Sequence, residues 1–189
     1  PAGVLNMLHG GEQVVNALCD HAQIKAVSFV GSTRVGTHVY NRASQNGKRV
    51  QCMMGAKNHA IVMPDADLDN VVNSLLGAAF GSSGERCMAL SVAVAVGDEI
   101  ADKMIDALQA AMSKLKFGVH SDKTNDFGPV ITAEHKAKVV GHIQSAAEQG
   151  AKVLVDGSAA APAGYENGFF VGATLIDGVT KDMSSYQAE

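Results

Sequence analysis

The sequence contains no tryptophan, has aromatic residues at only 5% of its positions, and carries no large excess of either charge. Its formal net charge is −4, and its basic clusters, at 48–49 and 114–116, are short. Proteins that bind nucleic acid or an anionic membrane surface usually carry a concentrated positive patch. We therefore expect no nucleic acid and no membrane among the partners of this protein.

Long hydrophobic runs and paired cysteines are lacking as well. The apolar stretches 74–80 and 89–96 are too short to cross a bilayer. Cys19, Cys52 and Cys87 show no metal-ligand spacing, and any disulfide would leave one of them unpaired. We expect a reducing compartment and no metal. A content of 47% hydrophobic and 18% charged residues is typical of a domain with a packed core.

Short β-rich runs alternate with segments of helical periodicity along the chain. Strands separated by helices of this length favour parallel βαβ units, so we predict an α/β fold. The expected strands are 4–8, 26–30, 49–54, 60–63, 91–96, 152–155 and 169–176. The expected helices are 12–21, 33–45, 67–80, 98–116 and 132–148. Residues 182–189 are expected to form a strand or a loop without a terminating signal, so the chain looks truncated at both ends.

Cys87 lies in the segment 84–90 (GERCMAL), after a glycine-containing apolar stretch at 75–84. The neighbouring cation of Arg86 favours the thiolate form of cysteine, which is the form that attacks carbonyl carbons. The pattern is also compatible with a small buried cysteine that only packs. Cys19 and Cys52 fall on a predicted helix and strand, and for them we expect packing alone.

Two glycine-containing turns precede this segment. In 29–36 (FVGSTRVG) a strand enters a turn and then a helix, which would direct free backbone N–H groups and a hydroxyl at an anion such as phosphate. A simple turn with a serine cap explains the same residues. In 53–59 (MMGAKNH), Gly55 permits close approach of the backbone to a ligand, whereas Lys57 and His59 could equally be solvated.

The order and spacing of these three motifs resemble the aldehyde dehydrogenase superfamily. The family has a Phe-x-Gly-Ser-Thr turn, then a Glu-Leu-Gly-Gly-Lys segment, then a nucleophilic cysteine. The segments 127–131, 165–171 and 186–189 resemble the family's later Gly-Pro, Gly-x-Phe-x-x-Pro-Thr and Glu-Ile-Phe-Gly-Pro motifs. The resemblance covers the whole chain and implies a three-layer αβα arrangement around a parallel sheet.

One departure from the family pattern is informative. Aligning 55–57 with the family's Gly-Gly-Lys places Met53 where the general-base glutamate normally lies, 34 residues before Cys87. A thioether cannot take a proton from water, so a thiol becomes the better acceptor of the acyl group. Met53 and Arg86 together resemble the coenzyme A-acylating methylmalonate-semialdehyde dehydrogenase branch.

The resemblance implies roles for particular residues. Cys87 would be the nucleophile, and Arg86 would pair with a carboxylate of the substrate. Gly31 and Ser32 would contact the NAD pyrophosphate, Gly55 would lie along the nicotinamide, and Glu189 would bind the nicotinamide ribose. Lys57 and His59 receive no role.

The resemblance also implies domains, cofactors and partners. Residues 1–54 would be the end of an NAD-binding, Rossmann-like domain, and 55–189 an incomplete catalytic domain. The parent enzyme would use NAD and coenzyme A to convert malonate or methylmalonate semialdehyde to acetyl-CoA or propionyl-CoA, with loss of carbon dioxide. A homo-oligomer, a tetramer in the family, would be expected in a bacterial cytoplasm, or in the mitochondrial matrix of a eukaryote.

Two alternatives stay open. The parent protein could be a hydrolytic aldehyde dehydrogenase for another semialdehyde, although a glutamate at position 53 would favour that reading more than methionine does. The chain alone could also be an inactive piece that folds in part but does not bind NAD, because a dinucleotide site needs strands on both sides of its crevice.

Overall fold

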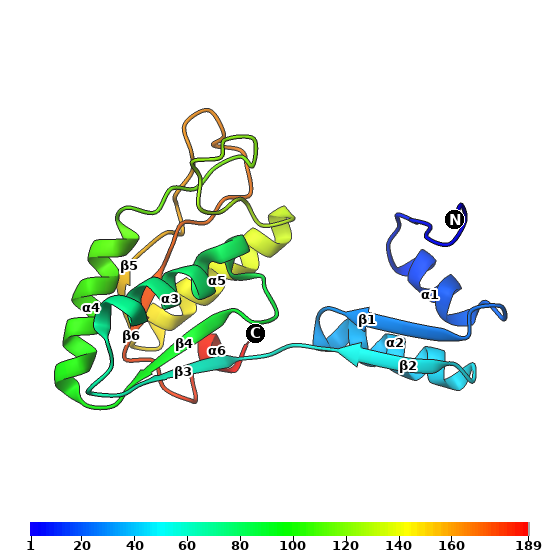
Figure 1. Ribbon diagram of the computed structural model, residues 1–189, viewed down its shortest axis with the longest axis horizontal. Helices are drawn as coiled ribbons and strands as arrows, with labels where there is room; N and C mark the ends of the chain where they lie inside the picture. Colours follow the sequence, from blue (N-terminus) through cyan, green and yellow to red (C-terminus); the bar gives the residue numbers. More distant parts are fainter. Residues whose placement is uncertain (189) are drawn as a thin grey trace. The chain divides into compact units, whose positions relative to one another are not determined.

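The computed structural model describes residues 1–188, which form two compact units, Pro1–Ala56 and the residues from Lys57 onward (Figure 1). Each unit contains helices and parallel strands, so the predicted α/β class is confirmed. The assignment of 1–54 to NAD binding and of 55–189 to catalysis stays a prediction. No helix within residues 1–188 has both the length and the apolar character that crossing a bilayer requires.

The first unit is a single βαβ element preceded by a helix. Strands β1 (Ala26–Val30) and β2 (Arg49–Met53) pair in parallel, with α2 (Thr33–Gln45) between them in the chain. Alternate residues of both strands are exposed and half-buried, as a sheet covered on one face requires. Cys19 on α1 (Glu12–Asp20) and two small α2 side chains form the buried core of this unit.

The prediction of a strand over 4–8 is wrong. These residues are irregular, and the side chain of Leu5 is 91% exposed. Apolar composition alone favours a strand, but a strand also needs a neighbouring strand that satisfies its backbone N–H and C=O groups. Residues 4–8 pair with no strand among the described residues.

The second unit begins with another parallel βαβ element. Strands β3 (Asn58–Val62) and β4 (Leu90–Ala95) pair in parallel across α3 (Leu68–Phe80) and the short 3₁₀ helix η1 (Gly81–Gly84). Helix α4 (Asp98–Met112) follows and ends four residues earlier than predicted. The buried core joins β3, α3 and α4 through the following residues: Val62, Val72, Leu75, Ile100, Met104, Leu108 and Met112.

The last elements depart from the expected parallel pattern. Helix α5 (Ala133–Glu148) leads to β5 (Lys152–Val155), which pairs with β6 (Leu175–Asp177) in antiparallel register. The strand predicted over 169–176 is therefore confined to its end, where it reaches β5. Residues 184–187 form the short helix α6 (Ser184–Gln187) instead of a strand or loop.

A close contact between two glycines lies just before β6 in the chain. Gly172 N–H donates to Gly157 O over 2.9 Å. A Cβ atom added to Gly157 would lie only 2.2 Å from Gly172 O. The two backbones therefore approach closely without side chains between them.

Candidate functional site

Cys87 lies at the tip of a turn that joins η1 to β4. The N–H of Ala89 donates to Arg86 O over 2.9 Å, which closes the turn with Cys87 and Met88 at its centre. Both central residues are exposed. The open alternative of a small buried packing cysteine is therefore wrong for Cys87, and the thiol is accessible to a substrate.

The chain approaches this turn through three successive residues in the left-handed region. The φ angles are 55° at Ser82, 57° at Ser83 and 75° at Gly84. Left-handed backbone is unfavourable for residues with a Cβ and persists only where neighbours hold it. The Ser83 hydroxyl supplies such a restraint by donating to Gly128 O over 2.6 Å.

A second restraint comes from Asn58, the first residue of β3. Its side-chain amide nitrogen lies 3.1 Å from Cys87 O and 2.8 Å from Ala89 O. One amide group therefore donates to two carbonyls of the same turn. Sequence reasoning missed Asn58, because no local pattern links residues that lie 29 and 31 positions apart.

Arg86 is exposed and packs its guanidinium against the backbone of Gly81. A Cβ at Gly81 would lie 2.6 Å from Arg86 Nη1, so glycine at that position leaves the space that the guanidinium occupies. Among residues 1–188, Arg86 makes no ion pair, whereas the adjacent Glu85 pairs with His135 over 2.9 Å. The cation of the residue that precedes Cys87 is thus exposed and not neutralised by a described carboxylate.

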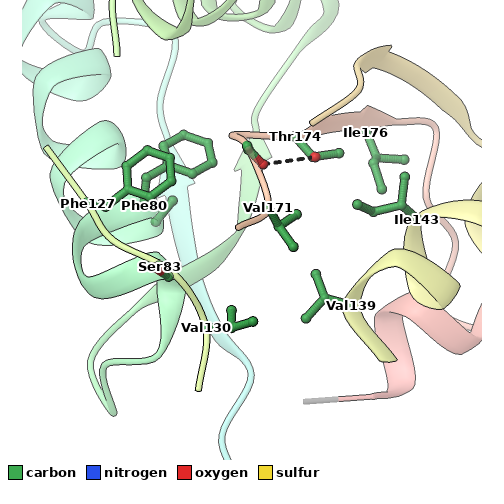
Figure 2. A pocket seen from close by; sticks show the side chains of 11 residues that line it. Phe80, Ser83, Phe127, Val130, Val139, Ile143, Val171, Thr174 and Ile176 are labelled. Atoms are coloured by element: carbon green, nitrogen blue, oxygen red, sulfur yellow. Dashed lines mark hydrogen bonds between the residues drawn. The ribbon is translucent and has the colours of Figure 1, made fainter. Parts of the chain in front are cut away.

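Figure 2 shows a cavity of about 220 Å³ behind this loop, lined mainly by apolar side chains. Phe80 and Phe127 lie on one side of it, and Val139 and Ile143 of α5 lie on the other. Ser83 also lines this cavity, but Cys87 does not. The cavity is therefore part of the packing that supports the loop rather than the place where the thiol reacts.

The predicted pyrophosphate contacts lie in the first unit, at the junction of β1 and α2. Ser32 occupies the N-cap position of α2, but its side chain makes no capping hydrogen bond. The structure therefore has the expected strand-to-helix turn with serine at the N-cap position, but without a side-chain capping bond. The hydroxyl and the first N–H groups of a 13-residue helix are suited to hold an anion.

The structure brings Gly55 next to this turn. Gly31 N–H donates to Met53 O over 3.2 Å, and Gly55 N–H donates to Thr33 Oγ1 over 3.3 Å. Gly31, Ser32 and Gly55 are thus neighbours in the first unit, while Arg86 and Cys87 are neighbours in the second. Thr33 was not singled out from the sequence, although its place in the Gly-Ser-Thr turn could have suggested it. Glu189 lies outside the described residues.

Cys87 should be the fastest-reacting cysteine of the chain. Cys19 is 1% exposed, and burial, followed by the nearby Asp20 carboxylate, raises the pKa of its thiol. Cys52 is half-buried against the same core. We expect iodoacetamide at neutral pH to modify Cys87 well before the others, as measured by peptide mapping over time. Equal or faster labelling of Cys19 or Cys52 would contradict this.

Comparison with known proteins places these features in one family. The aldehyde dehydrogenase family matches residues 1–189. The malonate-semialdehyde dehydrogenase of Pseudomonas aeruginosa is 51% identical over 189 residues, which are 100% of this chain and 38% of that protein. The acylating mitochondrial methylmalonate-semialdehyde/malonate-semialdehyde dehydrogenase of Rattus norvegicus is 48% identical over 189 residues, covering 100% of this chain and 35% of that protein.

A solved structure gives the same result for the fold. It is an NAD complex from Sinorhizobium meliloti 1021 assigned as a methylmalonate-semialdehyde dehydrogenase, with 51% identity and a TM-score of 0.95. The match covers 100% of this chain and 38% of that one. The chain thus spans well under half the length of these relatives. Because the family match covers every residue, the chain belongs to the aldehyde dehydrogenase family.

Proposed function

We propose that this chain is part of an NAD-dependent, coenzyme A-acylating dehydrogenase of malonate or methylmalonate semialdehyde. The observation that carries the proposal is Met53 at the position where the family pattern implies a general-base glutamate. The relatives named for these two semialdehydes support the choice of substrate. The rat relative's description as acylating supports the choice of acceptor.

Cys87 would perform the covalent chemistry. Its thiolate adds to the aldehyde carbon, and the aldehyde oxygen becomes an oxyanion in a thiohemiacetal. Among the described residues, the Cys87 N–H has no hydrogen-bond partner, so it can donate to this oxyanion. Loss of hydride from the same carbon then converts the thiohemiacetal to a thioester on Sγ.

NAD, when bound, supplies the hydride acceptor. The residues of the first unit fit its pyrophosphate, because Ser32 has an unused hydroxyl at the N-terminus of α2. Gly31 and Gly55 add exposed backbone without side chains beside that turn. Glu189 is proposed for the nicotinamide ribose on the basis of the family resemblance alone.

The identity of residue 53 decides how the thioester is released. A carboxylate can take a proton from water as water attacks, but the Met53 thioether cannot. A free thiol has a pKa of about 8.5, far below the pKa of bulk water, so a thiol needs far less help to become a nucleophile. Coenzyme A therefore replaces water, and its sulfur displaces Cys87 from the acyl carbon.

Arg86 would select substrates that carry a carboxylate. Arg86 immediately precedes Cys87 in the chain, and its exposed guanidinium offers a planar pair of donors to a carboxylate. The same carboxylate is later lost as carbon dioxide through the enolate of the thioester. That step needs no metal, because the thioester carbonyl itself accepts the electron pair.

A single-turnover experiment on the full-length enzyme tests the proposal. The enzyme is loaded with NAD and malonate semialdehyde, and the decay of the acyl-enzyme is followed by mass spectrometry with and without coenzyme A. We expect fast decay only with coenzyme A. Met53→Glu should speed decay in water, whereas the matched Met53→Gln, which lacks a carboxylate, should not.

Two outcomes would oppose the proposal. Rapid turnover by the wild-type enzyme in water alone would assign the parent protein to the hydrolytic class. Failure of acyl-enzyme to form on Cys87 at all would remove the cysteine from the reaction.

A further inference from the structure

We infer that Lys57 and Asn58 are two separate positioning residues for the proposed reaction. Asn58 holds the Cys87 turn in place, and Lys57 holds residues 184–188, the segment that precedes Glu189 in the chain. The inference rests on the proposed function and extends it to a part of the sequence that has no assigned role.

Lys57 binds backbone rather than a carboxylate. Its Nζ lies 2.8 Å from Ser185 O and 2.7 Å from Ala188 O, and it forms no ion pair with a described residue. The side chain is half-buried, and this burial lowers the pKa of its amine. Burying an ammonium costs free energy unless its hydrogens find acceptors, so the two carbonyls must offset that cost. The second of them belongs to the residue immediately before Glu189.

His59 contacts the same segment. Its Nε2 lies 2.9 Å from the Tyr186 hydroxyl, and the two rings meet edge to face at 5.5 Å. Its Nδ1 lies 2.7 Å from Lys57 O, which fixes the ring against the lysine backbone. The segment is thus attached to the beginning of β3 by two side chains.

Helix α5 and its C-cap residue Gln149 also contact the segment. Ser184 N–H donates to Gln149 Oε1 over 2.9 Å, and the hydroxyls of Ser145 and Ser184 lie 2.8 Å apart. A helix as short as α6 is not stable by itself in water. Its conformation therefore depends on these contacts, and the loss of any one of them should loosen the backbone of residues 184–188.

Asn58 directs its side chain elsewhere, as successive residues entering a strand do. Among the described residues, the side-chain amide of Asn58 donates hydrogen bonds to the carbonyls of the Cys87 turn. The Lys57 ammonium instead donates to the backbone carbonyls of Ser185 and Ala188. The beginning of β3 is therefore a junction at which neighbouring residues fix two different parts of the proposed site.

The two roles predict different kinetic losses in the full-length enzyme. Lys57→Met removes the ammonium but keeps an unbranched side chain. We expect it to raise the KM for NAD roughly 10- to 150-fold, the range for a lost charged hydrogen bond, while the rate of Cys87 alkylation changes less than about twofold. Lys57→Arg, which restores a cationic donor, should recover most of the affinity.

Asn58→Leu has a similar volume but no amide donors. We expect it to change the rate of Cys87 alkylation and to lower the rate of acylation about tenfold, because two neutral hydrogen bonds are lost. The KM for NAD should stay within about twofold of the wild-type value.

Lys103→Met serves as the matched control for Lys57→Met, because Lys103 is an exposed lysine of α4 that pairs with Glu99 on the same helix.

Amide hydrogen exchange supplies a readout that does not depend on activity. In Lys57→Met, exchange should quicken within 184–188 and stay unchanged around Cys87. Asn58→Leu should give the reverse pattern. If Lys57→Met does not fold, Lys57→Gln carries the same comparison.

The inference is overturned if both variants lower the same parameters together, since that is the signature of a general loss of structure. It is also overturned if Lys57→Met leaves the KM for NAD and the exchange of 184–188 unchanged. An enzyme that does not use NAD would contradict the proposed function. The alkylation and exchange measurements would still show whether Lys57 holds residues 184–188 and whether Asn58 holds the Cys87 turn.

Discussion

Replacing Cys87 by alanine in the full-length enzyme is expected to lower kcat for the oxidation of malonate semialdehyde by about four orders of magnitude or more. Removal of a covalent nucleophile eliminates the pathway that it opens, and losses of that size follow in other enzymes. NAD binding should persist, because Gly31, Ser32 and Gly55 belong to the other unit. The measurement is NADH formation by absorbance, with NAD affinity by calorimetry.

Cys52→Ala is the matched control for this experiment. Cys52 packs against the core of the first unit and has no proposed chemical role, so its variant should keep near-normal kcat. A Cys87→Ala enzyme that retains more than about one hundredth of the wild-type rate would show that the reaction does not pass through a thioester on this residue.

Arg86→Leu is expected to lower kcat/KM for malonate semialdehyde roughly 10- to 150-fold, which corresponds to about 1.5–3 kcal/mol for a charged hydrogen bond. The reason is that leucine cannot pair with the substrate carboxylate. Propanal has no carboxylate, so its much lower kcat/KM should hardly change. The ratio of the two kcat/KM values is the measured quantity.

Arg86→Lys separates charge from geometry. A lysine keeps the cation but loses the planar pair of donors, so it should recover only part of the preference for malonate semialdehyde. Equal losses for both substrates in Arg86→Leu would mean that Arg86 acts by favouring the thiolate of Cys87 instead.

The local elements of the fold were predictable from the sequence, because their signals are local. The helix over 33–45 and the strand over 152–155 were predicted with the bounds that the structure has. The predicted helix over 67–80 is present as α3, and the Asp67 carboxylate caps it by accepting from Asn70 N–H. The errors at 4–8 and 169–174 have a different origin. A strand forms only where a second strand, often distant in the sequence, pairs with its backbone. A hydrophobic pattern does not predict whether such a second strand is present.

The candidate site was predictable only in part, for a related reason. Cys87 and Arg86 belong to a recognisable motif, and the structure places them in an exposed turn. The supports of that turn are not in the motif. Asn58 reaches it from 29 positions away, and Lys57 reaches Ser185 from 128 positions away. Such contacts arise from the folded topology, so no spacing rule could have identified them.

The hydrogen bond from Ser83 to Gly128 also has a consequence for protein synthesis. The two residues lie 45 positions apart, so the left-handed stretch before Cys87 loses this restraint whenever Gly128 is not yet in place. At about 5–20 residues per second, a ribosome needs roughly 2–9 s to make the chain between them. During that interval the Cys87 turn has the restraint from Asn58 but not the one from Gly128. The reactive turn is therefore completed late, after translation has passed residue 128.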